Sequence, residues 1–328
     1  MSFALYRRPG AVIFLDDDMD YLEMLAEVMP MDWHLHLMLR PVACIEMLLE
    51  EITSKELDMW RQQEIIQRWR EGSPLIPQIL KYWRDDGTAR FTLTQVCVVD
   101  YSMPAMSGLK VLSELTDWSG SRVLLTGRAD EQLAVSAFNR GLIEQFIPKQ
   151  SPDIRLRLTE AIGQLRRKPE ARHEQIWRAT LSREQSAFLR DAKIAAALDK
   201  LADKQEWVEH VVIGAPFGIL ALDNTARAMW LQLEPSDRLA ELAEMTATQD
   251  WDADTVQQVL TGKKLIDLEL HLALGDHHKP RPQEAFIIGS GDARLHAALF
   301  DISEMFCPLP SDGYQNFTAR QSHRQVRD

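Results

Sequence analysis

The sequence predicts an α/β protein with a doubly wound parallel sheet, followed by a smaller α+β domain. Apolar, strand-like runs alternate with helical segments through the first half of the chain, which is the pattern of such a sheet. In the second half, two strand-like runs flank an Asp-Asn turn, and helical patterns and further strands follow. With 328 residues, the chain has room for about two domains.

The strands of the first half each end in a polar residue. Residues 11–15 form an apolar run that stops at Asp16 and Asp17, as expected of a buried strand that carries carboxylates at its C-terminal end. A helix follows and stops at Pro30, and residues 33–39 alternate as a strand does. Three more buried strands are expected at 96–99, 123–125 and 145–147, and these end at Asp100, at Thr126 and near Lys149.

These polar ends predict one crevice, because ligands of open α/β sheets bind beyond the carboxyl ends of the strands. Asp16, Asp17 and Asp100 would repel one another there unless a cation offsets their charge. Oxygen ligands with room for water favour Mg²⁺. Asp100 is then a candidate nucleophile toward a phosphoryl donor, with Lys149 and Thr126 placed to contact the phosphoryl oxygens.

The segments VIFLDDDMD, VCVVDYSMPAMSG, VLLTG and FIPK resemble the receiver domain of two-component response regulators over residues 10–167. The resemblance implies a five-stranded sheet of flavodoxin-like order, Mg²⁺ as cofactor, and a histidine kinase or phosphotransfer protein as donor. It also implies residue roles: a metal site at Asp16, Asp17 and Asp100, the phosphoacceptor at Asp100, and phosphoryl-binding and switch residues at Thr126, Lys149 and Phe146.

Two features depart from the family pattern. Asp100 follows Asp17 by 83 positions, about twice the family's separation, so a helical insertion is expected at about 52–90. Its tryptophans either seat the added helices on the receiver or form a docking surface for a kinase or a second subunit. Pro148 precedes Lys149, whereas receivers usually carry a proline after the lysine. A proline fits an edge strand, but the aim of Lys149 is left open.

Residues 168–208 are expected to form a helical connector. Ile194, Leu198, Leu201 and Val208 fall at coiled-coil spacing over about two heptads, which permits either a homodimer or packing of the helix on its own domain. His173 on this connector is expected to be an ordinary exposed histidine.

Residues 209–308 loosely resemble a PAS domain, and 309–328 are expected to be a flexible tail. Strands are expected at 265–274, around 284–290 and around 293–302, which places His271 and His296 in strands. His277 and His278 fall in a turn. A metal or haem site at these histidines is less favoured than surface positions, because no cysteine or second acid stands at ligand spacing. No cofactor-binding residue is predicted in this half.

Composition narrows the function further. The formal net charge of −12 argues against binding nucleic acid, and no apolar run is long enough for a membrane helix. Acidic residues near the N-terminus argue against a signal peptide, so a cytoplasmic location is expected. The favoured hypothesis is a phosphorylation-controlled regulator that acts by protein–protein interaction and is no enzyme beyond its own phosphorylation chemistry. The alternatives are an enzymatic output, with Asp252, Asp254 and the His277–His278 turn as candidates, and a scaffold that does not cycle.

Overall fold

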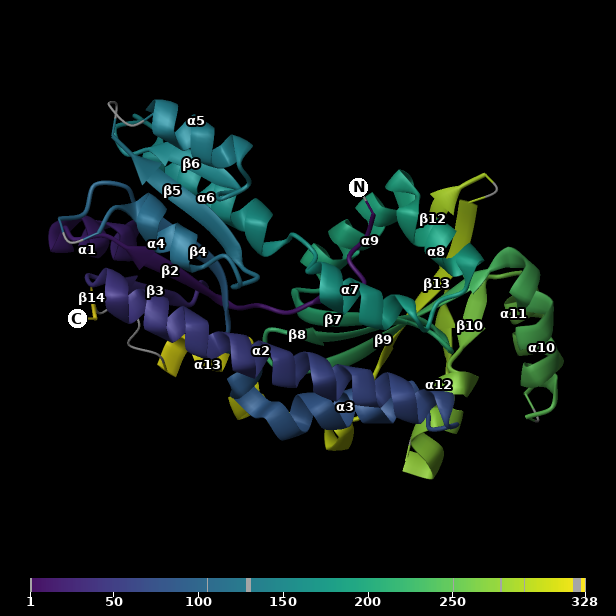
Figure 1. Ribbon diagram of the computed structural model, residues 1–328. Coiled ribbons are helices and arrows are strands. Elements are labelled where there is room, and N and C mark those ends of the chain that lie inside the picture. Colours follow the sequence, from purple (N-terminus) through teal and green to yellow (C-terminus); the bar gives the residue numbers. More distant parts are fainter. Residues whose placement is uncertain are drawn as a thin grey trace. The chain divides into compact units, whose positions relative to one another are not determined.

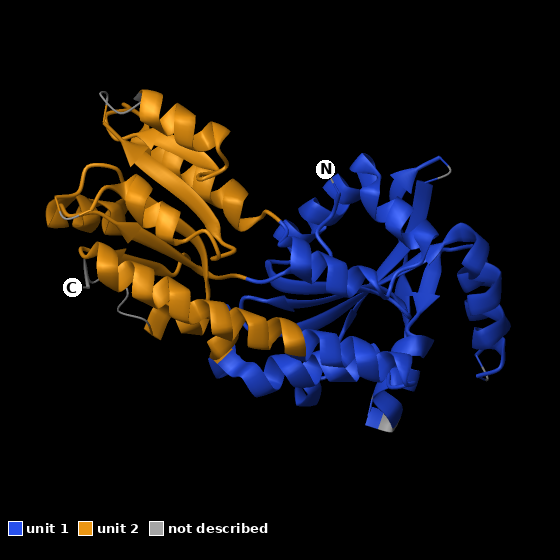
Figure 2. Cartoon of the chain, in the orientation of Figure 1, with its two compact units in different colours: residues 1–8, 61–87, 169–314 blue, residues 9–60, 88–168, 315–328 orange. Residues whose placement is uncertain are grey.

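The protein divides into two compact units (Figure 2). The computed structural model describes residues 2–104, 106–127, 131–249, 251–277, 279–291, 293–320 and 326–327. Unit 1 contains Met1–Arg8, Arg61–Gly87 and Pro169–Tyr314, and unit 2 contains Pro9–Trp60, Thr88–Lys168 and Gln315–Asp328. Each unit has a six-stranded sheet of its own. No helix among the described residues is long and apolar enough to span a membrane.

Unit 2 is the predicted doubly wound domain (Figure 1). All strand pairs in its sheet are parallel. In spatial order the strands are β14 (Val326–Arg327), β3 (Leu35–Met38), β2 (Ala11–Leu15), β4 (Thr94–Asp100), β5 (Ser121–Thr126) and β6 (Gln145–Pro148). The order β3-β2-β4-β5-β6 is the flavodoxin-like order. The predicted five-stranded sheet is therefore confirmed, and β14 adds a sixth strand at one edge.

Strands β2, β4 and β5 are buried on both faces, which explains their continuous apolar runs. Val12 and Phe14 of β2 point to one face, where helices α1 (Met19–Val28) and α6 (Ile154–Arg166) pack. Ile13 and Leu15 point to the other face. That face is covered by α2 (Pro41–Arg70), α4 (Gly108–Glu114) and α5 (Glu131–Asn139).

The expected insertion at 52–90 contains two helices, but the first of them begins before the insertion. One continuous helix of 30 residues, α2, runs from Pro41 through the first part of the insertion to Arg70. It is followed by α3 (Leu75–Asp86) and the 3₁₀ segment η1 (Gly87–Phe91). Residues 61–87 belong to unit 1, where Trp83 is fully buried and Gln62 Oε1 accepts a hydrogen bond from Trp177 Nε1 at 2.8 Å. Trp83 therefore packs in unit 1 and not on the receiver sheet.

Part of the expected flexible tail, residues 314–320, forms a helix. Helix α13 (Tyr314–Arg320) is held by buried aromatic rings, since Tyr314 and Phe317 are 5% and 4% exposed. The ring of Phe317 lies 5.0 Å from that of His34 and 5.5 Å from that of Phe91. Polar composition suggested fraying, but these two aromatic side chains supply the buried surface that holds the segment.

Unit 1 contains an antiparallel sheet with helices around it. In spatial order its strands are β1 (Tyr6–Arg7), β7 (Trp207–Gly214), β8 (Phe217–Asp223), β9 (Ala228–Pro235), β13 (Ala293–Asp301) and β12 (Phe286–Ser290). A separate small pair joins β10 (Lys264–Ile266) to β11 (Pro282–Glu284). The helices are α7 (Ala171–Arg178), α8 (Arg183–Arg190), α9 (Ala192–Lys204), α10 (Leu239–Ala247), α11 (Ala253–Leu260) and α12 (Leu268–Leu274).

The α+β composition of unit 1 agrees with the prediction, but one expected strand is wrong. Residues 265–274 divide into β10 and α12, so His271 lies in a helix, whereas His296 lies in strand β13 as expected. Leucine at every second position fits both periods, and Leu, Glu and Ala favour a helix once the β-branched residues end at Ile266. Strand β7 was not predicted, and its first two residues lie in the stretch expected to be the helical connector.

The connector helices pack on their own unit. Ile194, Leu198 and Ala202 of α9 are buried, and Lys193 Nζ donates a hydrogen bond to Ser290 Oγ of β12 at 3.0 Å. The apolar stripe is therefore explained by packing within unit 1, and a homodimer through these helices stays a prediction. His173 is 3% exposed and stacks on Tyr6 with ring centroids 4.8 Å apart, so the expected exposed position is wrong.

Candidate functional site

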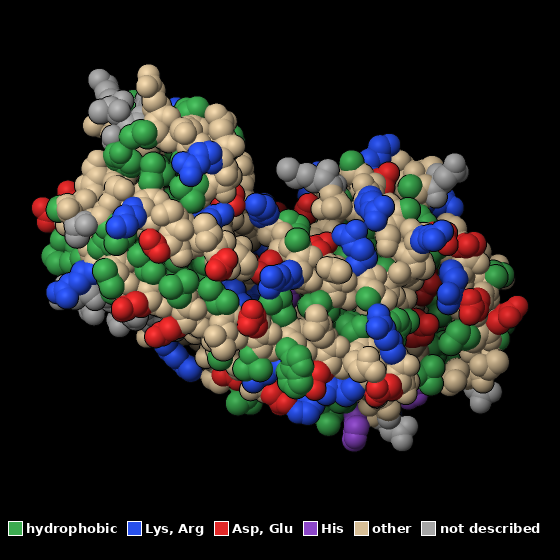
Figure 3. Space-filling model, in the orientation of Figure 1, with side chains coloured by type: hydrophobic (Ala, Val, Ile, Leu, Met, Phe, Trp, Pro, Cys, Tyr) green, Lys and Arg blue, Asp and Glu red, His purple; other side chains and the backbone are tan. Residues whose placement is uncertain are grey.

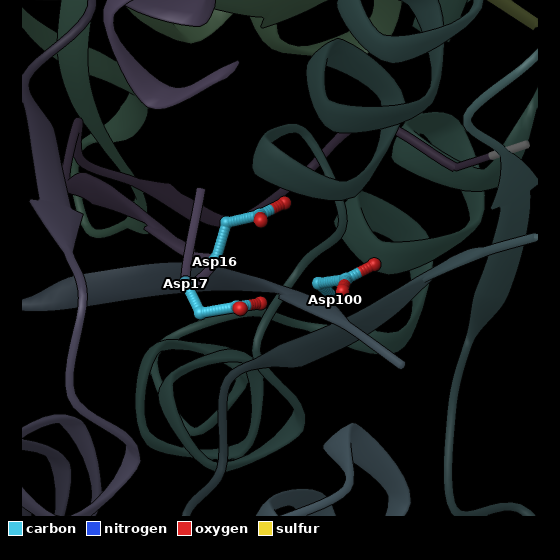
Figure 4. Close-up of side chains that lie close together, drawn as sticks. All are labelled: Asp16, Asp17 and Asp100. Carbon is cyan, nitrogen blue, oxygen red and sulfur yellow. The ribbon is translucent and has the colours of Figure 1, made fainter. Parts of the chain in front are cut away.

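The three predicted acidic residues lie together at the carboxyl ends of β2 and β4 (Figure 4). Asp16 and Asp17 follow β2, and Asp100 is the last residue of the neighbouring strand β4. One carboxylate oxygen of each lies within 4.8 Å of the others. Asp16 and Asp100 are 1% and 4% exposed, whereas Asp17 is exposed. The buried carboxylates of Asp16 and Asp100 therefore lie beside the solvent-exposed carboxylate of Asp17.

Lys149 reaches the acidic cluster from the end of β6. Its Nζ lies 2.6 Å from Asp16 Oδ2 and 2.8 Å from Asp100 Oδ1. Pro148 pairs with Thr126 on edge strand β6, and the Lys149 N–H donates to the Thr126 carbonyl at 2.9 Å. Because β6 is an edge strand, the missing N–H of Pro148 removes no hydrogen bond from the interior of the sheet. The Lys149 amine still points at both carboxylates.

Burial and neighbouring charges shift the pKa values of Asp16 and Lys149 in opposite directions. Burial raises the pKa of Asp16 above its usual value, although Lys149 and the Asp18 N–H act to lower it. Burial lowers the pKa of Lys149, but its hydrogen bonds to Asp100 and Asp16 outweigh this effect and leave that pKa raised. The directions are compatible, because Lys149 faces two carboxylates and Asp16 faces one ammonium. Three carboxylates against one ammonium leave two formal negative charges (−3 + 1 = −2).

Thr126 contributes a buried hydroxyl at the end of β5. The residue is fully buried, and its Oγ1 has no hydrogen-bond partner among the described residues. A buried polar atom without a partner costs about 1–3 kcal/mol, so native proteins seldom keep one without a reason. The hydroxyl is thus available to a ligand at the carboxyl end of the sheet.

The backbone around the acids is held by short local contacts. Asp100 Oδ2 accepts a hydrogen bond from Ser102 N, and Asp16 Oδ1 accepts one from Asp18 N, both at 3.1 Å. Gly108 lies so close to Asp100 that a Cβ there would stand 2.2 Å from the Asp100 carbonyl oxygen. This contact explains the glycine in the SMPAMSG segment, because no other side chain leaves room for the turn.

Two further residues shape the site, and sequence reasoning missed their roles. Asp18 is the N-cap of α1, and its carboxylate accepts a hydrogen bond from Tyr21 N at 3.1 Å. Tyr21 lies under the lysine, with Lys149 Nζ 4.6 Å from its ring centroid. Burial, together with Asp16 and Asp100, raises the pKa of Tyr21 well above its usual value. A tyrosine in the first turn after the acids was the available signal.

The remaining candidates are not members of the acidic cluster. Phe146 is half-buried in β6 and packs against the core on the α2 side of the sheet. Asp252 caps α11 by accepting from Thr255 N at 2.9 Å, and Asp254 accepts from Gln258 Nε2, so both have structural partners. His277 is exposed, and His278 lies outside the described residues. Within the part of the chain that the structure describes, Asp16, Asp17 and Asp100 form the one cluster of metal-ligating type.

Comparison with solved structures supports the fold described above. The response regulator LqsR of Legionella pneumophila matches 99% of this chain over 99% of its own, with 20% identity and a TM-score of 0.72. The chain has the fold of a response regulator. Unit 2 is the part of this fold that carries the acidic cluster, at the carboxyl ends of its strands.

Two solved receiver domains are also similar to part of this chain. One from Clostridium thermocellum matches 48% of this chain and 93% of its own, with 16% identity and a TM-score of 0.30. Another, from an HD domain-containing protein of Pseudomonas fluorescens, matches 52% of this chain and 92% of its own, with 18% identity and a TM-score of 0.33. No protein-family model matches the sequence, and no curated protein matches it. The PAS likeness of residues 209–308 stays a prediction.

Proposed function

We propose that the protein is a signalling switch controlled by phosphorylation of Asp100. The phosphoryl group would come from a histidine kinase or a phosphotransfer protein, and the response would be a changed protein–protein interaction. The observation that carries the proposal is the convergence of Asp100, two further carboxylates and Lys149 at one end of the receiver sheet. The buried Thr126 hydroxyl, which has no partner among the described residues, supports it independently.

Asp100 would act as the nucleophile. Its carboxylate oxygen attacks phosphorus, a new oxygen–phosphorus bond forms, and the bond from phosphorus to the donor's leaving group breaks with the electron pair going to that group. Lys149 would move its ammonium from the Asp100 carboxylate to a phosphoryl oxygen, where it offsets the negative charge of the transferred group.

The donor set fits Mg²⁺. Asp16, Asp17 and Asp100 offer only oxygen ligands, and their two uncompensated negative charges favour a divalent cation. These three residues would hold the ion, which supplies charge neutralisation at the phosphoryl oxygens when bound. Exposed Asp17 leaves one side of the cluster open to water and to the donor.

Thr126 and Phe146 would convert phosphorylation into a change of shape. A phosphoryl oxygen supplies the partner that the Thr126 hydroxyl lacks among the described residues, so the end of β5 is drawn toward Asp100. Phe146, half-buried on the adjacent strand, can then repack. The mixture of acidic and basic side chains on the face drawn in Figure 3, together with the net charge of −12, favours a protein partner over nucleic acid.

Intact mass spectrometry after incubation with acetyl phosphate and Mg²⁺ tests the proposal. The wild type should gain one phosphoryl group, and chelation of Mg²⁺ should prevent the gain. Asp100→Asn should gain none, whereas Asp117→Asn, which changes an exposed acid of the same unit, should behave as wild type. Absence of any gain in the wild type would leave the non-cycling scaffold as the better description. Light scattering on the same samples tests the predicted homodimer.

A further inference from the structure

A cleft of about 640 Å³ opens on unit 1, to which the proposed function assigns no chemical activity. It lies where the end of β9, the end of α11 and strand β13 meet. Its lining combines apolar side chains with two hydroxyl side chains, a histidine, two cations and one acid, Glu284. The residues used below are Ser236, Leu239, Leu260, Gly262, Lys263, Ile287, Arg294 and His296.

Ser236 and His296 form a hydrogen-bonded pair in this cleft. His296 lies in β13 directly across from Glu234 of β9, and Ser236 follows two residues later at the start of the 3₁₀ segment η3 (Ser236–Arg238). The His296 Nε2 lies 3.3 Å from Ser236 Oγ. The imidazole is 6% exposed, whereas the serine is exposed to the cleft. A reactant can therefore reach the hydroxyl while the ring stays fixed.

The backbone of Gly262 selects the tautomer of the histidine. His296 Nδ1 lies 3.1 Å from the Gly262 carbonyl oxygen, which can only accept, so Nδ1 carries the proton. Nε2 is then left with a lone pair directed at the Ser236 hydroxyl. This is the arrangement of a serine nucleophile with a histidine base, in which a backbone carbonyl takes the place of an orienting carboxylate.

Gly262 also makes room for the ring. Its φ of +67° lies in the left-handed region, and a Cβ there would stand 2.3 Å from His296 Cε1. Any other residue would both strain the backbone and push the imidazole away from its carbonyl partner. The glycine therefore positions the base.

Arg294 places the positive charge of its guanidinium beside the Ser236 hydroxyl. Its Nε and Nη2 lie 3.4 and 3.3 Å from Ser236 Oγ, and no ion pair joins it to a carboxylate among the described residues. Lys263 lines the same cleft. A guanidinium beside a hydroxyl stabilises the developing alkoxide and, later, the oxyanion of a tetrahedral intermediate.

We propose that Ser236 is the nucleophile of an esterase site in unit 1, with His296 as general base and small carboxylic esters as substrates. Leu239, Leu260 and Ile287 give the cleft an apolar wall for a short acyl chain. The Ser236 oxygen bonds to the ester carbonyl carbon as its proton passes to His296 Nε2, and the carbonyl electron pair moves onto oxygen beside Arg294. Collapse breaks the bond to the alcohol, which leaves with the proton from His296. Water repeats the sequence and releases the carboxylic acid.

Labelling of the full chain with a fluorophosphonate probe tests this site, with p-nitrophenyl butyrate as the substrate. Peptide mapping should place the label on Ser236. Ser236→Ala should abolish labelling, and His296→Gln should slow ester hydrolysis by roughly 100-fold or more, the range of a general base. Ser303→Ala is the matched control, because Ser303 is exposed in the same unit and its side chain makes no cap hydrogen bond. Gly262→Ala should lower kcat with little change in KM, since it displaces the base without altering the apolar wall.

Hydrolysis that persists in Ser236→Ala, or a label found only on other residues, would overturn the proposal. The proposal also fails if wild type stays unlabelled while a known serine hydrolase in the same tube is labelled. Asp100→Asn should label as fast as the wild type, because the esterase site does not depend on phosphorylation. Failure of one proposal is therefore distinguishable from failure of the other.

Discussion

Replacing Thr126 by valine should make the protein more stable and less responsive. Thr126 is fully buried, and its hydroxyl has no partner among the described residues, whereas valine has nearly the same shape. Removing such a hydroxyl avoids a desolvation cost of about 1–3 kcal/mol, so the free energy of unfolding should rise by that amount. A stable protein would discard this hydroxyl unless its function needed it.

The opposite result is expected for Thr94→Val in the same sheet. Thr94 is also fully buried, but its Oγ1 donates to Glu51 Oε1 at 2.7 Å and its N–H to Glu51 Oε2 at 2.9 Å. Burial already raises the pKa of Glu51, so loss of one donor leaves a buried carboxyl poorly paired. Thr94→Val should therefore lower the free energy of unfolding by about 1–3 kcal/mol.

Urea unfolding of both variants in the absence of Mg²⁺ measures these changes. Beryllofluoride with Mg²⁺, a mimic of the phosphoryl group, should then bind Thr126→Val roughly 10- to 150-fold more weakly, because one hydrogen bond to a charged group is worth about 1.5–3 kcal/mol. If Thr126→Val is destabilised as Thr94→Val is, the Thr126 hydroxyl has a partner in the folded protein. The reasoning about its availability would then be refuted.

Three other changes test the structure around the site and in unit 1. Gly108→Ala should cost about 1–3 kcal/mol, because the added Cβ meets the Asp100 carbonyl, while Gly163→Ala, which meets nothing in α6, should be neutral or stabilising; urea unfolding compares them. The raised pKa of Asp16 means that the folded state binds its proton more tightly than the unfolded state, so its contribution to stability increases as pH falls through that pKa toward 3.8. The free energy of unfolding of Asp16→Asn, relative to that of the wild type, should therefore be higher at neutral pH than at acid pH. Unfolding curves recorded without Mg²⁺ at both pH values measure this, and a difference that does not change with pH would contradict it. Gln62→Leu should cost about 1–3 kcal/mol in thermal or urea unfolding, because it leaves the buried Trp177 indole N–H without its acceptor.

Much of the receiver could be predicted because local signals and global fold agree there. Buried strands at 11–15 and 96–99 read as apolar runs, and each ends in the acid that the topology brings to the crevice. The order of strands determines which side chains meet, so ordered landmarks along the chain were enough to place the acidic cluster. Pro148 raised a doubt that only the folded structure removes, since the direction of Lys149 depends on how β6 lies beside β5.

The predictions failed where one sequence pattern fits both a strand and a helix, and where segments far apart in the sequence contact each other. Alternating leucines at 265–274 match a strand and a helix alike, and the helix formers decide for α12. The fate of residues 61–87 depends on partners such as Trp177, which lies 115 positions from Gln62. No local pattern reveals such a partner. The pairing of Ser236 with His296 was missed for the same reason, because strand register brings them together.

Strand β14 and helix α13 affect how unit 2 folds during synthesis and where a fragment of it can end. These C-terminal elements belong to unit 2, yet they are synthesised after all of unit 1. His34 and Phe91 therefore gain the ring of Phe317, and the edge of β3 is paired, only after the residues of unit 1 have been synthesised. A fragment that stops near residue 168 would expose an aromatic patch and a bare strand edge, which invites aggregation. Expression of the receiver alone should be planned with that segment supplied.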